Sequence, residues 1–284
     1  PYSAYSVFAG NPLLISPEDL EEEGLLPLGS CSALYAKGPF PAQQVDFERA
    51  GRLLLPLLRD CYRFSRDKLL EEISSFRREQ SYWLEDYALF MALRRQQRGD
   101  SYLKWPRPLL FREQWALEEA AQKLAEEVEF HVFVQYLFFR QWTALRRYAN
   151  QRGIQIFGDV PIYVDRESAD VWAKPWVFEL DEDLQPVEVA GVPPDAFSQE
   201  GQLWGNPLYR WDALKADGYS WWIQRLTIAS HWYDWVRIDH FRGLESYWAV
   251  PKDAQTARVG SWKKGPGMDF LHEVKKALPH CRLV

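Results

Sequence analysis

The chain has 284 residues, of which 47% are hydrophobic and 26% are charged, and its formal net charge is −6. This is the composition of an ordinary globular protein, with a length that allows one large domain or two smaller ones. The acidic balance argues against nucleic acid or an anionic membrane as a partner, and no apolar run approaches the roughly 20 residues that span a bilayer. The three cysteines are widely spaced, so we expect neither a zinc site nor a disulfide but reduced thiols in the cytoplasm.

Aromatic residues are the unusual part of the composition. The chain holds 14 Trp, 14 Tyr and 16 Phe, which together make 15% of its residues. Trp and Tyr combine a flat apolar face with a polar edge, and such a surface suits the apolar face of a sugar ring. Most of these side chains must belong to the core, so the composition favours a carbohydrate ligand without establishing one.

The first half of the chain is predicted to be mainly helical. Ser16 can cap a short helix that has Pro17 at its first position, whereas residues 25–45 read as loop because they hold several Gly and Pro. From residue 46 the apolar spacing is helical, with a kink expected at Pro56. The expected helices cover residues 46–64, about 66–78, about 81–98 and about 113–150, and residues 101–113 are expected to form a loop.

The second half alternates between strand and helix patterns. The segment "RGIQIFGDVPIYV" (152–164) is a β-branched and aromatic run typical of a buried parallel strand, and "WVRIDHF" (235–241) is a second. A long loop is expected over residues 165–220. Helices are expected over residues 219–234 and 268–280, and "CRLV" (281–284) begins a third strand. This order predicts a parallel α/β fold. About three strand–helix units are visible, whereas a closed (β/α)8 barrel has eight, so we expect the chain to be part of a larger fold.

Two acidic residues stand where parallel strands end. They are Asp159 in "IQIFGDVPIYV" and Asp239 in "WVRIDHFRG", and functional side chains of parallel α/β folds gather at such ends. Arg237 is two residues before Asp239, so both point to the same side of a strand. A neighbouring positive charge favours the ionised form of a carboxylate, which suits a retaining glycosidic nucleophile. The same spacing also fits an ion pair that only fixes strand register.

The loop "VAGVPPDAFSQEGQLWGNPLYRW" (189–211) carries the second group of candidates. It combines an acid, a hydroxyl, an amide and flat aromatic rings. In a sugar-binding loop the aromatic rings would stack on the sugar and the polar groups would form hydrogen bonds to it. A loop with a purely structural role is the alternative. The candidate residues of this loop are Asp195, Phe197, Ser198, Trp204 and Asn206.

Two weaker candidates follow the second strand. His240 can bond a sugar hydroxyl or face the neighbouring helix, and Glu245 can be an acid catalyst or a salt-bridged surface residue. No glycine-rich phosphate cradle of the Walker or Rossmann type occurs in the sequence, so a nucleotide cofactor is not expected.

Four segments resemble a known family. They are "PYSAYSVFAGNPLLIS", "GIQIFGDVPIYV", "GVPPDAFSQEGQLWGNPLYRW" and "VRIDHFRGLESYW", and they resemble the 4-α-glucanotransferases (amylomaltase, or disproportionating enzyme) of glycoside hydrolase family 77, in the α-amylase clan. The resemblance implies part of a (β/α)8 TIM barrel with a large, mainly helical insertion. It divides the chain into a barrel loop segment (1–12), the insertion (13–150), and central barrel strands with substrate-binding loops (151–284).

The resemblance also implies roles. Asp239 would be the catalytic nucleophile that forms a covalent glucosyl-enzyme, and Arg237 would orient it. Asp159 would close a polar network around that arginine and the bound sugar, and Tyr2 would stack near the scissile glucose. The loop from Asp195 to Ser198, with Trp204 and Asn206, would line the donor and acceptor subsites. The substrates would be α-1,4-glucans and maltooligosaccharides, with no metal or organic cofactor.

Other parts of the family pattern are expected to lie outside this sequence. They are the general acid/base glutamate on the next barrel strand, a further aspartate, and the first two strands. We therefore expect the 284 residues alone to have little transferase activity. A non-catalytic glucan-binding module is the main alternative, and a helical interaction domain joined to an α/β remnant is a third. The oligomeric state and the preferred glucan length are not predicted.

Overall fold

The computed structural model describes residues 3–38 and 43–284, which divide into two compact units. The strand unit comprises Pro1–Phe8, Gln97–Ala116 and Arg146–Val284, and the helical unit comprises Ala9–Gln96 and Leu117–Leu145. These units do not follow the predicted boundaries after residues 12 and 150. Residues 97–116 belong to the strand unit, where the indole N–H of Trp172 donates to the carbonyl of Leu109 over 2.9 Å.

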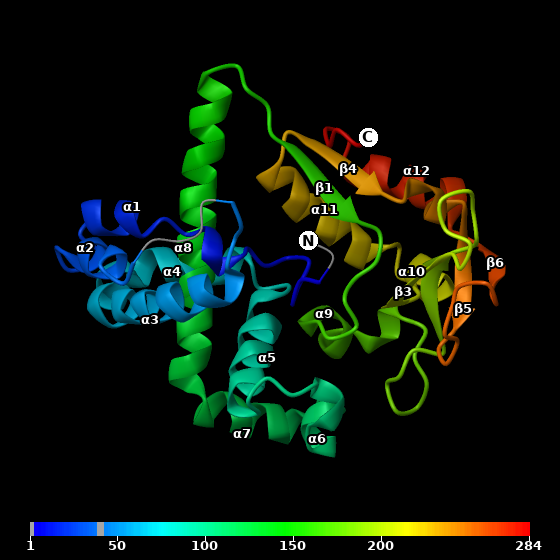
Figure 1. Cartoon of the computed structure of the whole chain (residues 1–284), viewed down its shortest axis with the longest axis horizontal. Helices are drawn as coiled ribbons and strands as arrows, with labels where there is room; N and C mark the ends of the chain where they lie inside the picture. Colours follow the sequence, from blue (N-terminus) through cyan, green and yellow to red (C-terminus); the bar gives the residue numbers. More distant parts are fainter. Residues whose placement is uncertain (1–2, 39–42) are drawn as a thin grey trace. The chain divides into compact units, whose positions relative to one another are not determined.

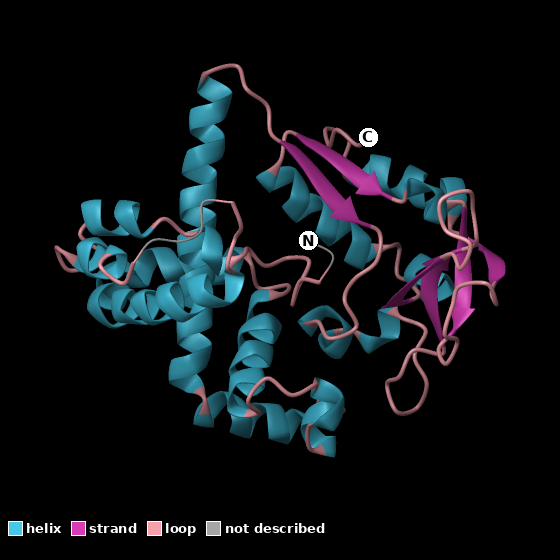
Figure 2. Ribbon diagram, viewed as in Figure 1, coloured by secondary structure: helices cyan, strands magenta, loops and turns pink. Residues whose placement is uncertain are grey.

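The helical unit consists of helices and short connections (Figure 2). Its elements are η1 (Pro12–Leu14), α1 (Pro17–Glu22), α2 (Ser30–Tyr35), α3 (Phe47–Ser65), η2 (Arg66–Leu69), α4 (Leu70–Glu79), α5 (Leu84–Gln96), most of α7 (Gln114–Lys123) and the larger part of α8 (Ala125–Gln151). The predicted long helix over 113–150 is interrupted at Leu124, between α7 and α8. Its expected burial is confirmed over the first half of α8, where Tyr62 of α3 packs edge-on against Phe130 and Phe133.

The start of the helical unit confirms one local prediction and corrects another. The Ser16 hydroxyl caps α1 by accepting from the amide of Asp19 over 3.2 Å. The expected loop over 25–45 is wrong in part, because it contains α2. The carboxylate of Glu21, in α1, accepts hydrogen bonds from the first amides of α2, among them that of Ser30 at 2.9 Å. This cap comes from another helix, so the local sequence pattern does not reveal it.

Two parallel strands form the centre of the strand unit. β1 (Phe157–Pro161) pairs with β4 (Trp235–Asp239), and Leu283 forms a parallel bridge to Val236 where a third strand was expected. The helix α11 (Ser220–Trp232) packs beside both strands (Figure 1), and α12 (Gly267–Ala277) follows before the bridge. The strands are half-buried rather than fully buried as expected. Val160, Val236 and Ile238 face the core, while the alternate positions carry the polar side chains and are partly exposed.

Two strands of an antiparallel sheet, β2 and β3, lie in the segment 165–220 that was expected to be a long loop. The strand order of this sheet is β3-β2-β5-β6. Its strands are β2 (Glu188–Val192), β3 (Gln202–Pro207), β5 (Ser246–Pro251) and β6 (Ser261–Lys264). The remaining elements of the strand unit are η3 (Tyr102–Lys104), α6 (Arg107–Leu110), α9 (Ala169–Ala173), η4 (Pro175–Val177), α10 (Trp211–Ala216) and η5 (Phe241–Leu244). The loop prediction failed because β2 pairs with β5, a partner far away in the sequence.

Candidate active site

Two carboxylates share one guanidinium group on the paired strands β1 and β4, where Asp159 lies in the middle of β1 rather than at its end and Asp239 is the last residue of β4. Arg237 Nη1 lies 2.6 Å from Asp159 Oδ1, and Arg237 Nη2 lies 2.5 Å from Asp239 Oδ1. The parallel register sets Asp159 opposite Arg237 and Pro161 opposite Asp239. Because alternate residues of a strand point to the same side, all three charged side chains lie on one face. The expected pairing of Arg237 with Asp239 is present, and Asp159 joins it.

This group of charges is open to solvent. The side chains of Arg237, Asp159 and Asp239 are 45%, 37% and 29% exposed. The hydrogen bond to Asp159, followed by the charge of Asp239, raises the pKa of Arg237. An arginine is protonated at every physiological pH in any case. Asp239 therefore has a permanent positive neighbour without being sealed from an incoming ligand.

A cavity of about 800 Å³ lies beside Asp239. Among the described residues, its lining comprises Ser3, Pro161, Ile162, Tyr163, Asp165, Arg166, Glu167, Gln202, Leu203, Trp204, Gly205, Asn206, Asp239 and His240. Four of the predicted site residues, Trp204, Asn206, Asp239 and His240, are thus brought together. This volume falls within the range of small-molecule sites.

One wall of the cavity is built by β3. The indole N–H of Trp204 donates to Gln202 Oε1 over 3.0 Å, and its ring stands edge-on to the imidazole of His240 with centroids 4.9 Å apart. Asn206 donates through Nδ2 to the carbonyl of Val164, over 2.7 Å, and so ties β3 to the segment after β1. The wall therefore presents a half-exposed aromatic face at a fixed position.

His240 takes a left-handed backbone conformation (φ +55°) directly after the strand. Burial lowers the pKa of His240, although the charge of Asp239 acts in the opposite direction. A neutral imidazole can both donate and accept a hydrogen bond. Gly243 packs closely on this turn, where an added Cβ would lie 2.8 Å from Ile162 Cδ1 and 3.1 Å from His240 Cδ2. These contacts restrict where the imidazole can lie.

The other residues of the predicted clamp lie outside this lining. The Asp195 carboxylate accepts from the amides of Phe197 and Ser198, both over 2.8 Å. The Ser198 hydroxyl donates to the carbonyl of Gly201 over 2.7 Å, while the ring of Phe197 is 98% exposed. In this structure the acid and the hydroxyl shape their own loop. Their contact with sugar stays a prediction, and Tyr2 lies outside the described residues.

Sequence reasoning missed several polar residues that line the cavity. Asp165, Arg166 and Glu167 lie in the loop after β1, separated from its end by residues 162–164, and Gln202 begins β3. The Ser101 hydroxyl donates to Glu167 Oε1 over 2.8 Å and so anchors this turn. Their position in the loop after the carboxyl end of a parallel strand was the available signal. Within the described residues no cluster of three or more His, Cys, Asp or Glu could hold a metal ion, and no helix is long and apolar enough to cross a membrane.

Parallel strands with a carboxylate, Asp239, at the carboxyl end of β4 and an aromatic-walled cavity beside it define an α/β protein with its candidate site at the usual edge of the sheet. The chain belongs to glycoside hydrolase family 77, whose model, described as 4-alpha-glucanotransferase, matches residues 1–284. Two similar curated proteins bear the same name. The protein from Thermus thermophilus is 47% identical over 280 residues, which cover 97% of this chain and 55% of that protein. The protein from Aquifex aeolicus is 45% identical over 287 residues, which cover 98% and 56%.

Solved structures of similar proteins confirm the predicted fold class. The amylomaltase from Streptococcus agalactiae in complex with acarbose superposes with a TM-score of 0.94 at 38% identity, covering 100% of this chain and 57% of that one. The amylomaltase from Corynebacterium glutamicum, at 20% identity and a TM-score of 0.79, shares the fold. The chain is thus part of an α/β barrel with a mainly helical insertion. It spans about half the length of the curated relatives that it matches.

Proposed function

We propose that this chain carries the nucleophile half of a 4-α-glucanotransferase, which transfers α-1,4-glucan segments between maltooligosaccharides. The observation that carries the proposal is the position of Asp239. It ends a parallel strand, lines the cavity, and binds Arg237 over 2.5 Å. The names of the relatives and the acarbose complex of the Streptococcus agalactiae protein support the substrate class.

The proposed chemistry is a retaining double displacement. In the first step Asp239 attacks the anomeric carbon, the glycosidic C–O bond breaks, and the leaving 4-oxygen takes a proton from a general acid. In the second step the 4-hydroxyl of an acceptor gives its proton to the same group, now a base, and displaces the carboxylate from the sugar. Arg237 binds Asp239 Oδ1 over 2.5 Å and so orients the attacking carboxylate.

The acid/base is a carboxylate that we do not assign to Asp159. Asp159 Oδ1 is bound to Arg237 over 2.6 Å, so we place Asp159 in the polar network that holds the nucleophile. The family resemblance assigns this role to a glutamate outside the 284 residues. We therefore expect these residues alone to bind glucans but to transfer them poorly, because a retaining mechanism needs two carboxyl groups roughly 5–5.5 Å apart.

Transfer rather than hydrolysis requires that a sugar, not water, occupy the acceptor position. Trp204 and Tyr163 line the cavity with rings that suit the apolar face of a sugar. An acceptor stacked there displaces water from the glycosyl-enzyme. The stacking is the part of the proposal that Trp204 variants can test. A cytoplasmic location stays a prediction.

The proposal is tested with Asp239→Asn in the full-length protein. Wild-type protein is expected to convert maltotriose into glucose and longer oligosaccharides, and the variant is expected to lose roughly 10³-fold or more of this rate. Asp253→Asn is the matched control, because Asp253 is exposed in the turn after β5 and does not line the cavity. An Asp239→Asn protein with the wild-type rate would overturn the proposal. Maltooligosaccharide binding without any turnover by the wild-type protein would favour the glucan-binding module.

A further inference from the structure

A buried arginine lies beneath the cavity and plays no part in the chemistry described above. Arg225, in α11, is only 3% exposed. Its Nη1 donates to the carbonyl of Ile162 over 3.1 Å and to the Tyr209 hydroxyl oxygen over 3.2 Å, and its Nη2 donates to the carbonyl of Pro161. The guanidinium also lies against the ring of Trp222, 4.7 Å from its centroid.

These contacts hold two successive backbone carbonyls at the end of β1. Pro161 is the last residue of β1, and Ile162 lies beyond the parallel ladder with a side chain that is 3% exposed. A buried carbonyl without a donor costs about 1–3 kcal/mol. The Tyr209 hydroxyl donates to the Ile162 carbonyl as well, over 2.6 Å. One planar guanidinium and one phenol together hold two successive carbonyls.

Burying a permanent charge is costly, so an arginine at this place needs a physical reason. The desolvation of a charged group costs several kcal/mol even after relaxation. A rigid, planar fork of donors can meet two carbonyls at once, whereas an ammonium group is a single point charge. Asp170, 5% exposed on α9, provides a negative charge in the same buried region. It accepts from the Ser6 hydroxyl over 3.0 Å and from the Val7 amide over 2.8 Å.

The residues held by Arg225 are also residues of the cavity. Pro161 and Ile162 both line it, and Pro161 is the register partner of Asp239 across the two strands. Ile162 is also the side chain that packs against the tight turn at Gly243, next to His240. A shift of this backbone would therefore move the floor of the cavity relative to the nucleophile.

We propose that Arg225 is a positioning residue for glycosyl transfer, which fixes the backbone at Pro161 and Ile162 so that a sugar resting on it meets the carboxylate of Asp239. The inference rests on the proposed function of Asp239. It assigns to Arg225 an effect on the rate of the chemical step and not only on stability. A misplacement of about 1 Å can reduce a rate about 100-fold.

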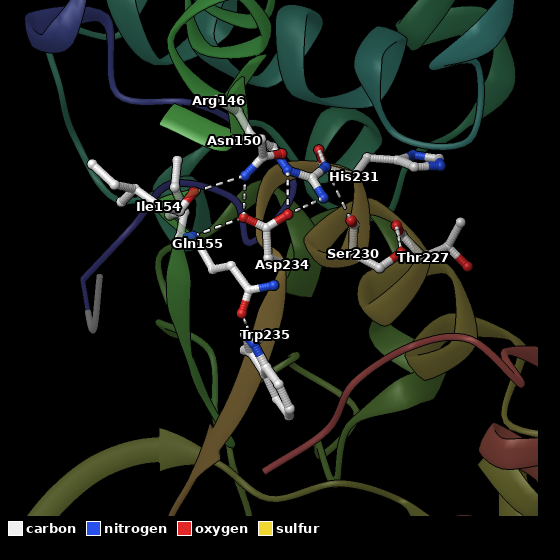
Figure 3. A network of polar contacts seen from close by, with 10 residues as sticks. Arg146, Asn150, Ile154, Gln155, Thr227, Ser230, His231, Asp234 and Trp235 are labelled. Carbon is white, nitrogen blue, oxygen red and sulfur yellow. Dashed lines mark hydrogen bonds and ion pairs between the residues drawn. The ribbon is translucent and has the colours of Figure 1, made fainter. Parts of the chain in front are cut away.

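The test compares two Arg→Lys substitutions in the full-length protein. Arg225→Lys keeps the positive charge but cannot reach both carbonyls and the phenol. Arg146→Lys is the matched control, because Arg146 likewise donates to two backbone carbonyls, those of Ser230 and His231, and it binds the carboxylate of Asp234 as well (Figure 3). Its network joins the beginnings of β1 and β4 through Asp234, away from the strand ends that carry the cavity.

We expect Arg225→Lys to lower kcat for maltotriose by about tenfold or more, measured at least 15 °C below its melting temperature, with a smaller change in KM. Arg146→Lys should lower the melting temperature and leave kcat unchanged. Tyr209→Phe, which removes only the phenol hydroxyl, should also lower kcat, by a smaller factor. This variant replaces Arg225→Lys as the test if Arg225→Lys does not fold.

The outcomes separate this inference from the function on which it rests. One outcome is that wild-type protein is active, Asp239→Asn is inactive, and both Arg225→Lys and Tyr209→Phe keep the wild-type kcat. In that case Arg225 has only a structural role, and the inference is wrong while the proposed function stands. An equal loss of kcat in Arg225→Lys and Arg146→Lys would also overturn it, because the effect would then be one of general stability. If the wild-type protein does not disproportionate maltotriose, the proposed function fails and the inference fails with it.

Discussion

The ring of Trp204 stands edge-on to the ring of His240, at 84° and with 4.9 Å between centroids. This contact joins β3 of the antiparallel sheet to the turn that follows β4 of the parallel pair. Edge-to-face pairs of this kind contribute about 0.5–1.5 kcal/mol beyond their buried area. The cavity wall and the candidate nucleophile are therefore linked through adjacent aromatic side chains.

Trp204→Ala is expected to weaken the use of oligosaccharides more than it weakens the fold. Trp204 is 37% exposed, so little core packing is lost, whereas the stacking face for the sugar disappears. We expect the KM for maltotriose to rise about tenfold, which corresponds to about 1.4 kcal/mol, with a small change in melting temperature. Trp262→Ala is the control, since Trp262 is 47% exposed on β6 and does not line the cavity. An unchanged KM in Trp204→Ala would count against the stacking role.

Asp234→Asn is expected to destabilise the strand unit without changing its chemistry. The Asp234 side chain is 13% exposed and accepts from Arg146 Nη2 (2.8 Å) and Asn150 Nδ2 (2.8 Å), as Figure 3 shows. It also accepts from the amide of Ile156 (2.7 Å). Removing the negative charge of Asp234 leaves the positive charge of Arg146 without its partner. We expect a loss of about 2–3 kcal/mol in the free energy of unfolding, measured by urea denaturation. Asp183→Asn, at an exposed turn, is the control.

The destabilisation caused by Asp234→Asn is expected to depend on pH. Burial pushes the pKa of Asp234 upward, but hydrogen bonds from Ile156, Arg146 and Asn150 outweigh it, and the net pKa is lowered. A carboxylate with a lowered pKa stabilises the fold above its unfolded pKa of about 3.9, and this stabilisation is lost as the pH falls through the folded value. The stability difference between wild type and Asp234→Asn should therefore shrink below about pH 4. A difference that stays constant down to pH 2 would contradict this account.

Glu127 is expected to control the acid stability of the helical unit. Its side chain is 15% exposed and contacts Arg59 at 2.7 Å, Arg95 at 3.1 Å and His131 at 3.3 Å. Burial alone would raise the pKa of Glu127, but the hydrogen bonds and charges of His131 and Arg59 lower it to about 2. The stabilisation, about 3 kcal/mol, is present above about pH 4.3 and is lost as the pH falls toward 2.

The measurement is the stability of Glu127→Gln between pH 6 and pH 2, followed by circular dichroism during urea denaturation. Wild-type protein should lose stability steeply below about pH 4, and the variant should start lower and depend less on pH. Glu126→Gln is the matched control, because Glu126 is the exposed neighbour in the first turn of α8. Parallel pH profiles for wild type and Glu127→Gln would show that Glu127 does not carry this effect.

Local sequence patterns predicted the features whose causes are local. The cap at Ser16 depends on residues within one turn, and the amphipathic spacing of α3 identified that helix even across Pro56. The spacing of Arg237 and Asp239 predicted one shared face, because strand periodicity allows no other arrangement for residues two apart. The motifs around these residues also identified the family, which the comparisons confirm.

Only the tertiary structure decided which side chains surround the candidate nucleophile. Asp195 and Ser198 looked equivalent to Trp204 and Asn206 in the sequence, yet the first two bond to their own loop while the others line the cavity. The pairing of β2 with β5 and the arginine beneath Pro161 likewise join segments that are distant in the chain. A sequence pattern records the period and the chemistry of a segment. It does not record which backbone groups from remote segments come within reach of a side chain, and only the folded structure brings Arg225 to the carbonyls of Pro161 and Ile162.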